Sequence, residues 1–167
     1  LLLGALRFLL AACPAVFFLR APKVPWQLYL AYGMTISVGQ FAFLFSAIHV
    51  GMPSGLASLV LQSQAFFTML FAALWLKESW RTSQLVGLLL AACGLALIGS
   101  AHGVSMPLLG FLLTVAAASL WAAGNIVTRA VAACGPINQL AFVVWASLVP
   151  PLPFLALSLL IEGRPAI

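Results

Sequence analysis

The sequence predicts an all-α fold, a polytopic bundle of transmembrane helices, and three observations lead to this fold class. Hydrophobic residues make up 65% of the 167 positions and charged residues only 5%, whereas about a quarter of the residues in a soluble domain are charged. The apolar residues form long runs, and a hydrocarbon core about 30 Å thick needs about 20 of them per helix. Short connections separate the runs, so consecutive helices should be antiparallel neighbours in one bundle.

Six runs are apolar and long enough to be transmembrane helices surrounded by the lipid bilayer. They cover residues 1–19, 28–50, 54–76, 84–101, 107–130 and 137–161. Prolines mark expected helix starts or kinks at Pro14, Pro53, Pro107, Pro136, Pro150, Pro151 and Pro153. Small residues predict close helix packing on the fourth run and at the start of the third, at Gly87, Ala91, Gly94, Gly51 and Gly55.

The net charge of +5 comes from Lys and Arg residues that are spread along the chain, so no basic tract suggests nucleic acid as a partner. If the six runs are correct, one side of the membrane receives Arg20, Lys23, Lys77, Arg81 and Arg129. The connections at residues 51–53 and 102–106 contain no Lys or Arg. Because positive residues mark the cytoplasmic side, the first run should start outside the cell. We therefore expect this chain to be a piece of a longer protein.

Polar residues inside the third run fall on one face of a helix. At 100° per residue, an arc of about 160° contains Ser54, Ser58, Gln62, Gln64 and Thr68. The second run places Gln40 near its middle on a similar small and polar face, and the fifth run has a stripe that includes Trp121 and Asn125. Amides offer donors and acceptors without a fixed charge. The pattern therefore predicts a shared midspan cavity that binds a polar small molecule, with Gln40, Gln62, Gln64, Trp121 and Asn125 as the substrate-binding residues.

A packing role is the alternative for each of these polar residues, because Gln, Asn, Ser and Thr also link transmembrane helices at about 0.6 kcal/mol per contact. Arg7 likewise has two interpretations, since a cation inside an apolar helix is costly. Its side chain either extends to the outer membrane interface or faces the bundle and pairs with a substrate carboxylate.

Metal, disulfide and cofactor sites find no support in the sequence. Cys13, Cys93 and Cys134 are an odd number of thiols, and we expect them to pack in the core. Neither His49 nor His102 has a second ligand at a suitable spacing, so we expect no metal and no cofactor. An intramembrane enzyme is a weak alternative, because Ser100 and His102 are poorly placed for a nucleophile and base pair. Trp26, Trp75 and Trp80 flank basic loops and predict interfacial anchors.

Several segments resemble a known family. The run GMPSGLASLVLQSQAFFTMLFAALWLKE at residues 51–78, the LRF at residues 6–8 and the paired Gly87 and Gly94 are similar to the EamA-type drug/metabolite transporters, and most of all to their O-acetylserine/cysteine exporter branch. The WAAGN segment at residues 121–125 resembles a family W-G-x-N pattern but has an extra Ala, which leaves the match of Asn125 open.

The resemblance implies a ten-helix transporter made of two inverted five-helix repeats. Residues 1–101 would be helices two to five of the first repeat, and residues 107–167 helices one and two of the second. By this resemblance, we expect a secondary exporter of cysteine-pathway metabolites and related small amino-acid derivatives, located in the bacterial inner membrane and not an enzyme. The alternatives are a membrane-embedded enzyme and a non-transporting assembly subunit. The oligomeric state is open, a homo-oligomer included.

Overall fold

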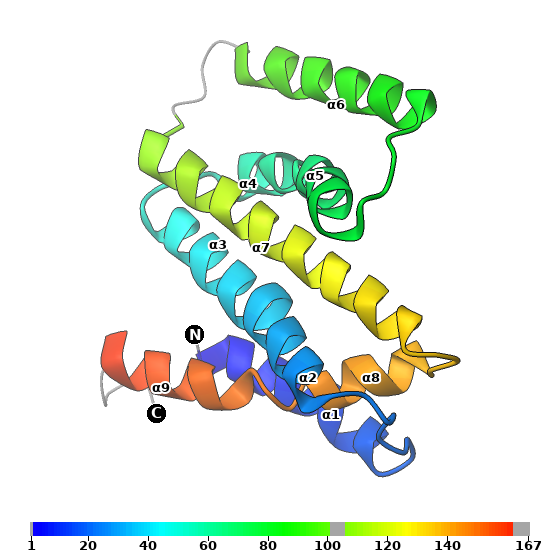
Figure 1. Ribbon diagram of the computed structural model, residues 1–167. Coiled ribbons are helices and arrows are strands. Elements are labelled where there is room, and N and C mark those ends of the chain that lie inside the picture. Colours follow the sequence, from blue (N-terminus) through cyan, green and yellow to red (C-terminus); the bar gives the residue numbers. More distant parts are fainter. Residues whose placement is uncertain (1, 101–105, 162–167) are drawn as a thin grey trace. The chain divides into compact units, whose positions relative to one another are not determined.

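All of the regular secondary structure in the residues that the structure describes is helical (Figure 1). The structure is a computed structural model and describes residues 2–100 and 106–161. Its elements are α1 (Leu2–Val16), α2 (Trp26–Tyr32), the π-helix η1 (Gly33–Gly39), α3 (Gln40–His49), α4 (Ser54–Leu61), α5 (Gln64–Leu76), α6 (Thr82–Ser100), α7 (Leu108–Ala133), α8 (Gln139–Ala146) and α9 (Pro151–Ile161).

Four stretches are long and apolar enough to cross a membrane, namely Trp26–His49, Ser54–Leu76, Leu108–Ala133 and Gln139–Ala156. They match four of the six predicted runs to within a few residues. The first and fourth predicted runs form α1 and α6, whose apolar stretches are shorter among the described residues. The predicted helical transmembrane bundle is therefore confirmed.

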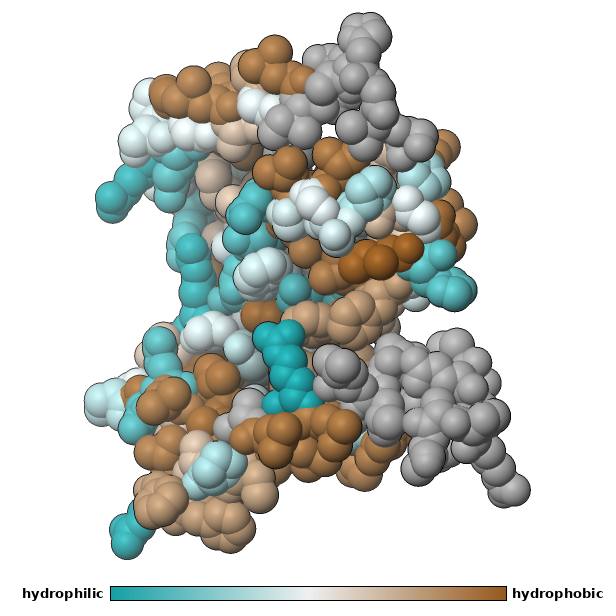
Figure 2. Space-filling model, turned by 180° about the vertical axis from the view of Figure 1, so that it is seen from behind, coloured by the Kyte–Doolittle hydropathy of each residue, from teal (hydrophilic) through white to brown (hydrophobic). Residues whose placement is uncertain are grey.

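The surface is as apolar as this fold class requires. Hydrophobic residues cover broad areas of the face shown in Figure 2. Among the exposed large hydrophobic side chains are Phe17 and Phe18, which are 82% and 87% exposed. A protein in water rarely exposes contiguous apolar areas of this kind. The three tryptophans predicted as anchors, Trp26, Trp75 and Trp80, are exposed and lie at or near helix ends, as expected for side chains at the lipid interface.

Prolines start or interrupt the helices where the sequence placed them. Pro53 directly precedes α4, and Pro151 begins α9 after α8 has ended at Ala146. Since proline has no N–H for the helix, it is accommodated in the first turn and disrupts an interior turn. The predicted sixth span is accordingly two helices, α8 and α9, with Pro150 fully buried between them.

The chain packs as two compact units. The first unit comprises Leu1–Ala42 and Gly124–Ile167, and the second comprises Phe43–Ala123. In the first unit α1 packs along α8 and α9, and α2 packs on α8. Aromatic side chains form its core: Phe8 lies between Phe41 and Phe154 at ring-centroid distances of 5.8 and 6.0 Å.

The π-helix η1 packs tightly inside the first unit because glycine stands at its contact points. A Cβ atom on Gly33 would lie 2.7 Å from the Cβ of Val149, in the break between α8 and α9. A Cβ atom on Gly124 of α7 would lie equally close, 2.7 Å, to the Cβ of Ile36 in η1. Real Cβ atoms essentially never approach this closely, so both contacts require glycine.

In the second unit, α3, α4 and α7 share a core. Ala47, Met52, Ala57 and Val60 form a buried cluster, against which α7 packs apolar side chains that include Phe111. Gly110 permits this contact, since a Cβ there would lie 2.9 Å from the Cβ of Met52. Tight glycine packing is thus present, but at positions other than the predicted ones. Added Cβ atoms at Gly55, Gly87 and Gly94 would meet no described atom within 4 Å.

The prediction that the cysteines pack in the core is wrong. Cys13, Cys93 and Cys134 are all free and exposed. Cys13 and Cys93 lie on outward faces of α1 and α6, and Cys134 lies just beyond the end of α7. A small apolar side chain is as acceptable on a lipid-facing surface as in a core, so residue type could not separate the two positions.

Candidate substrate site

The third predicted span is broken in the middle. Helix α4 ends at Leu61 and α5 begins at Gln64, so Gln62 and Ser63 form a turn between them. The N–H groups of these two residues donate to the carbonyl oxygens three positions earlier, Leu59 and Val60, at 3.1 and 3.0 Å. Interrupted helices at membrane depth are tolerated where they are buried in protein or line a cavity, and substrate sites of transporters use such breaks.

A cavity of about 680 Å³ lies beside this break, within the second unit. It is lined by Gln62, Ser63, Ala65, Phe66, Phe67, Met69, Gln84, Gly87, Leu88, Leu89, Ala91, Ala92 and Val115. Most of these residues are apolar and belong to α5 and α6. Pockets for small molecules typically have volumes of about 300–1,000 Å³ and a mainly apolar wall with few polar groups. The cavity has the size and the lining of such a pocket.

Three polar side chains belong to this wall, Gln62, Ser63 and Gln84, and they differ in their hydrogen-bond partners. The Gln84 side-chain oxygen accepts a hydrogen bond from the Arg81 backbone N–H at 2.9 Å, which satisfies one donor at the start of α6. The Ser63 hydroxyl oxygen is buried and has no hydrogen-bond partner among the described residues. A buried hydroxyl without a partner costs about 1–3 kcal/mol. Ser63 is therefore the polar group that gains most from a new partner.

The predicted residues of this unit gather around the break, although in different roles. Gln62 is exposed and lines the cavity, while the half-buried Gln64 is not among the lining residues. The Gln64 side-chain oxygen instead lies 3.4 Å from the Thr68 hydroxyl, one turn along α5. Trp121 of α7 packs on a buried cluster that contains Leu61, the residue directly before the break.

The second predicted span carries the other helix irregularity, the π-helix η1. The Gln40 N–H donates to the carbonyl of Thr35, five residues earlier, as a π-turn requires. Ser37 and Gln40 are almost fully buried, at 3% and 5% exposed. The Thr35 hydroxyl donates to the Ala31 carbonyl at 2.6 Å, which gives the loosened turn an additional bond. Single π-turns inside α-helices are frequent at functional sites.

Arg7 and Asn125 complete the predicted set and belong, like Gln40, to the first unit. The Arg7 side chain is exposed, and its guanidinium lies 5.0 Å from the ring centroid of Phe41 and 5.8 Å from that of Phe8. A guanidinium over an aromatic face is stabilised by cation–π attraction. Asn125 is half-buried on α7, next to the tightly packed Gly124.

Two residues of the site, Ser63 and Gln84, were not predicted from the sequence. One predicted candidate, His102 of the pair considered for an enzyme, lies outside the residues that the structure describes. Ser63 lies between Gln62 and Gln64, which the sequence predicts as substrate-binding residues, and the sequence gives no signal for the helix break that contains Ser63. Gln84 is the first residue of the fourth predicted run, and its polar side chain alone does not predict a place in a cavity.

Comparison with known proteins places the chain in a family. The model of the EamA-like transporter family matches residues 1–100. A "Probable amino-acid metabolite efflux pump" of Salmonella typhimurium is 52% identical over 166 residues, which is 98% of this chain and 56% of the relative. A protein of the same name from Escherichia coli K12 is 47% identical over the same shares of both chains.

A third relative, "Uncharacterized transporter YvbV" of Bacillus subtilis, is 31% identical over 126 residues, or 75% of this chain and 41% of the relative. The chain spans about half the length of the curated relatives it matches most fully. No solved structure matches it. With a family model that matches more than half of its residues and four helices able to cross a membrane, the chain belongs to the EamA-like transporter family.

Proposed function

We propose that this chain is part of a secondary exporter that carries small amino-acid-derived metabolites out of the cell across the bacterial inner membrane. The observation that carries the proposal is the helix break at Gln62 and Ser63 beside a cavity of about 680 Å³. The Ser63 hydroxyl at this break is buried and has no hydrogen-bond partner in the described part of the chain. The name shared by two relatives, "Probable amino-acid metabolite efflux pump", supports the substrate class. Cysteine-pathway compounds such as O-acetylserine and cysteine are the first candidates within it.

The cavity suits the properties of such a substrate. An amino-acid derivative has a short apolar part and several hydrogen-bonding groups. The apolar wall from α5 and α6 would receive the former, and Gln62 would hydrogen-bond with the latter. Ser63 would join on rotation of its side chain in another state of the transport cycle. Amides and a hydroxyl hold a ligand without a fixed charge, which favours weak binding and release on the far side.

Alternating access is the mechanism that we propose for movement across the membrane. The two proposed repeats, represented by residues 1–101 and 107–167, would move relative to each other so that a midspan site opens to each side in turn. The π-helix η1 and the break between α4 and α5 are the deformable points of their spans. Gln40, Trp121, Asn125 and Arg7 are proposed as further substrate contacts, with Arg7 as the carboxylate partner.

Export of radiolabelled substrate from cells that carry the full-length gene tests the proposed function. Cells preloaded with labelled cysteine or O-acetylserine should lose the label faster than cells with an empty vector. The released label should be chemically unchanged, which separates a transporter from a membrane-embedded enzyme. Equal efflux from both cell lines for a panel of amino-acid-derived metabolites would contradict the proposal and favour an assembly subunit.

A further inference from the structure

A second cavity, of about 370 Å³, lies in the first unit, where two connections between helices meet. The connection between α1 and α2 contributes Arg20, Pro22 and Lys23, and the connection between α7 and α8 contributes Cys134, Gly135, Pro136, Ile137 and Asn138. Both connections were predicted to lie on the cytoplasmic side of the membrane, and their meeting at one cavity places them on the same side. The proposed function makes no use of this cavity.

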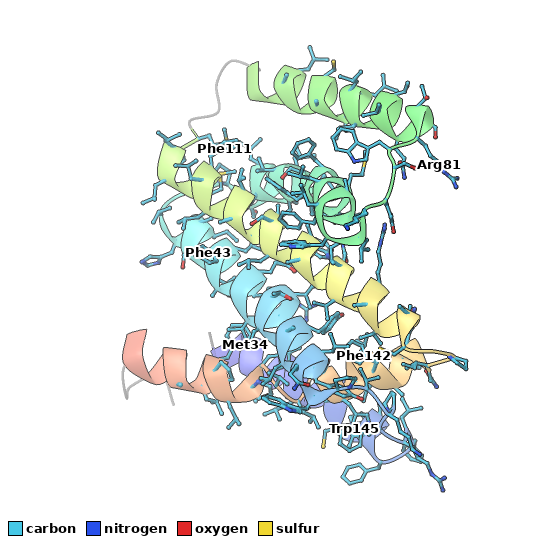
Figure 3. All side chains as sticks on the ribbon, viewed as in Figure 1. Met34, Phe43, Arg81, Phe111, Phe142 and Trp145 are labelled. Carbon is cyan, nitrogen blue, oxygen red and sulfur yellow. The ribbon has the colours of Figure 1, made fainter. Side chains whose placement is uncertain are left out.

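Side-chain hydrogen bonds hold the walls of the cavity in place. The Trp145 indole N–H donates to the Leu19 carbonyl oxygen at 2.9 Å, across 126 residues of sequence. Trp145 lies on α8 beside the α1–α2 connection (Figure 3). The Tyr29 hydroxyl donates to the Pro22 carbonyl oxygen at 2.8 Å. The segment that carries Arg20 and Lys23 is thus held by hydrogen bonds at Leu19 and at Pro22. Because the segment is already ordered, binding of a ligand by its two cations costs little additional conformational entropy.

The charge of the cavity is positive and not balanced within its wall. Arg20 and Lys23 both line it, and no Asp or Glu is among its described lining residues. An arginine guanidinium matches two oxygens of a phosphate group at once, and a lysine adds a point charge that adjusts to the same anion. The cavity therefore favours a phosphate group as its ligand.

Exposed aromatic residues that flank the segment 20–23 in the sequence favour a lipid phosphate over a dissolved one as the ligand. Phe17 and Phe18 directly precede this segment and are 82% and 87% exposed, and Trp26 follows it at 65% exposed. Aromatic side chains of this kind lie at the level of lipid headgroups, where acyl chains could contact them. Anionic lipids also concentrate basic residues on the cytoplasmic surface.

We infer that this cavity, defined by Arg20, Lys23 and the 134–138 connection, binds the phosphate of an anionic phospholipid. Arg20 and Lys23 contact the phosphate oxygens, while Phe17, Phe18 and Trp26 contact the acyl and glycerol parts of the same lipid. Bound lipid joins the start of α2 to the end of α7 within the first unit.

Cys134 supplies a reporter inside the cavity, because its thiol is exposed and it is a lining residue. In the full-length protein with every other cysteine replaced by Ser, the rate of reaction of Cys134 with a neutral maleimide is measured in lipid nanodiscs. Discs of phosphatidylcholine alone are compared with discs that also contain phosphatidylglycerol. Phosphatidylglycerol should slow the labelling. In Arg20→Gln/Lys23→Gln, the phosphatidylglycerol content needed for half-maximal protection should rise about 30-fold, the loss expected for two cations at about 1 kcal/mol each.

Two control variants make the result specific. Lys77→Gln/Arg81→Gln removes the same charge from another basic connection that does not line the cavity, and it should keep full protection. The charge-conserving Arg20→Lys/Lys23→Arg should also keep it, which separates loss of binding from loss of folding. Equal labelling in both kinds of disc, or equal loss of protection in the Lys77 and Arg81 control, would overturn the inference. Protection by soluble glycerol phosphate as strong as that by phosphatidylglycerol would overturn the assignment to lipid.

Discussion

Gly124 on α7 and Ile36 in η1 touch so closely that a Cβ atom added to Gly124 would lie 2.7 Å from the Cβ of Ile36. The same added atom would also lie 3.3 Å from the Thr35 hydroxyl. The atom that blocks a larger residue belongs to the rigid base of a β-branched side chain, which cannot turn away. The position of the π-helix in the first unit therefore depends on a missing methyl group on α7.

Replacing Gly124 with Ala should destabilise the protein by about 1–3 kcal/mol, the usual cost of forcing a methyl group into a well-packed contact. Gly87→Ala is the matched control, since an added Cβ there meets no described atom within 4 Å. The control should be neutral or gain up to about 1 kcal/mol from better helix propensity. Thermal unfolding of both variants in the same detergent measures the difference. A Gly124→Ala protein as stable as Gly87→Ala would disprove the contact.

The Ser63 hydroxyl provides a test that separates function from stability. In Ser63→Ala the buried unpaired oxygen is removed, so the thermal stability should stay equal or rise. If the hydroxyl binds the substrate during the cycle, the export rate or the apparent affinity should fall at the same time. Unfolding temperature and radiolabelled export are measured on one preparation. Unaltered export by a Ser63→Ala protein of unaltered stability would contradict a role of the Ser63 hydroxyl in substrate binding.

Membrane sidedness follows from the shared cavity of the α1–α2 and α7–α8 connections together with the rule that positive residues face the cytoplasm. Two full-length proteins with one cysteine each are compared, one with only the introduced Pro22→Cys and one with only the native Cys134. Both cysteines should resist impermeant thiol reagents in intact cells and react in inside-out vesicles. Val50→Cys, in the connection after α3, should behave in the opposite way. Rapid labelling of Pro22→Cys in intact cells would show that the α1–α2 connection faces outward and would contradict the predicted topology.

Lys77 ends α5 in a left-handed conformation, with φ at 54°. This backbone region costs a residue with a Cβ about 1–2 kcal/mol and costs glycine almost nothing. Lys77→Gly should therefore stabilise the protein by up to about 1 kcal/mol. Lys77→Ala removes the same charge but keeps the Cβ, and it should bring no gain. A higher unfolding temperature for the Ala variant than for the Gly variant would contradict the proposed helix end.

The positions of the membrane spans could be predicted from the sequence because they depend on the summed hydrophobicity of consecutive residues. A run of about 20 apolar residues is sufficient for a span whatever its neighbours are. The predicted run 54–76 is the stretch Ser54–Leu76 of the structure, and the fifth predicted run differs from α7 by a few residues. The helix starts at Pro53 and Pro151 could also be predicted from the sequence alone, since the effect of a proline on its helix is local.

The faces of the helices could not be predicted equally well, because the wheel of 100° per residue assumes an unbroken α-helix. The turn at Gln62 and Ser63 interrupts the regular α-helix of the third span, and of the two predicted glutamines beside it only Gln62 lines the cavity. The π-helix η1 departs from the wheel within the second span, because its hydrogen bonds join residues five apart and its turns are longer than those of an α-helix. Which glycines pack closely depends on the partner helix, and for this reason Gly87 and Gly94 were predicted in place of Gly33 and Gly124.

The most direct measurement of the central claim is the substrate affinity of Gln62→Leu and Gln64→Leu in the full-length exporter. Both changes are favourable for membrane insertion, but only Gln62 lines the cavity at the helix break. Gln62→Leu should weaken substrate binding about 5-fold to 150-fold, the equivalent of about 1–3 kcal/mol, at normal folded yield. Gln64→Leu should have the smaller effect on affinity. Unchanged affinity and unchanged export in both variants and in the double variant, at normal expression, would contradict a substrate site at this break.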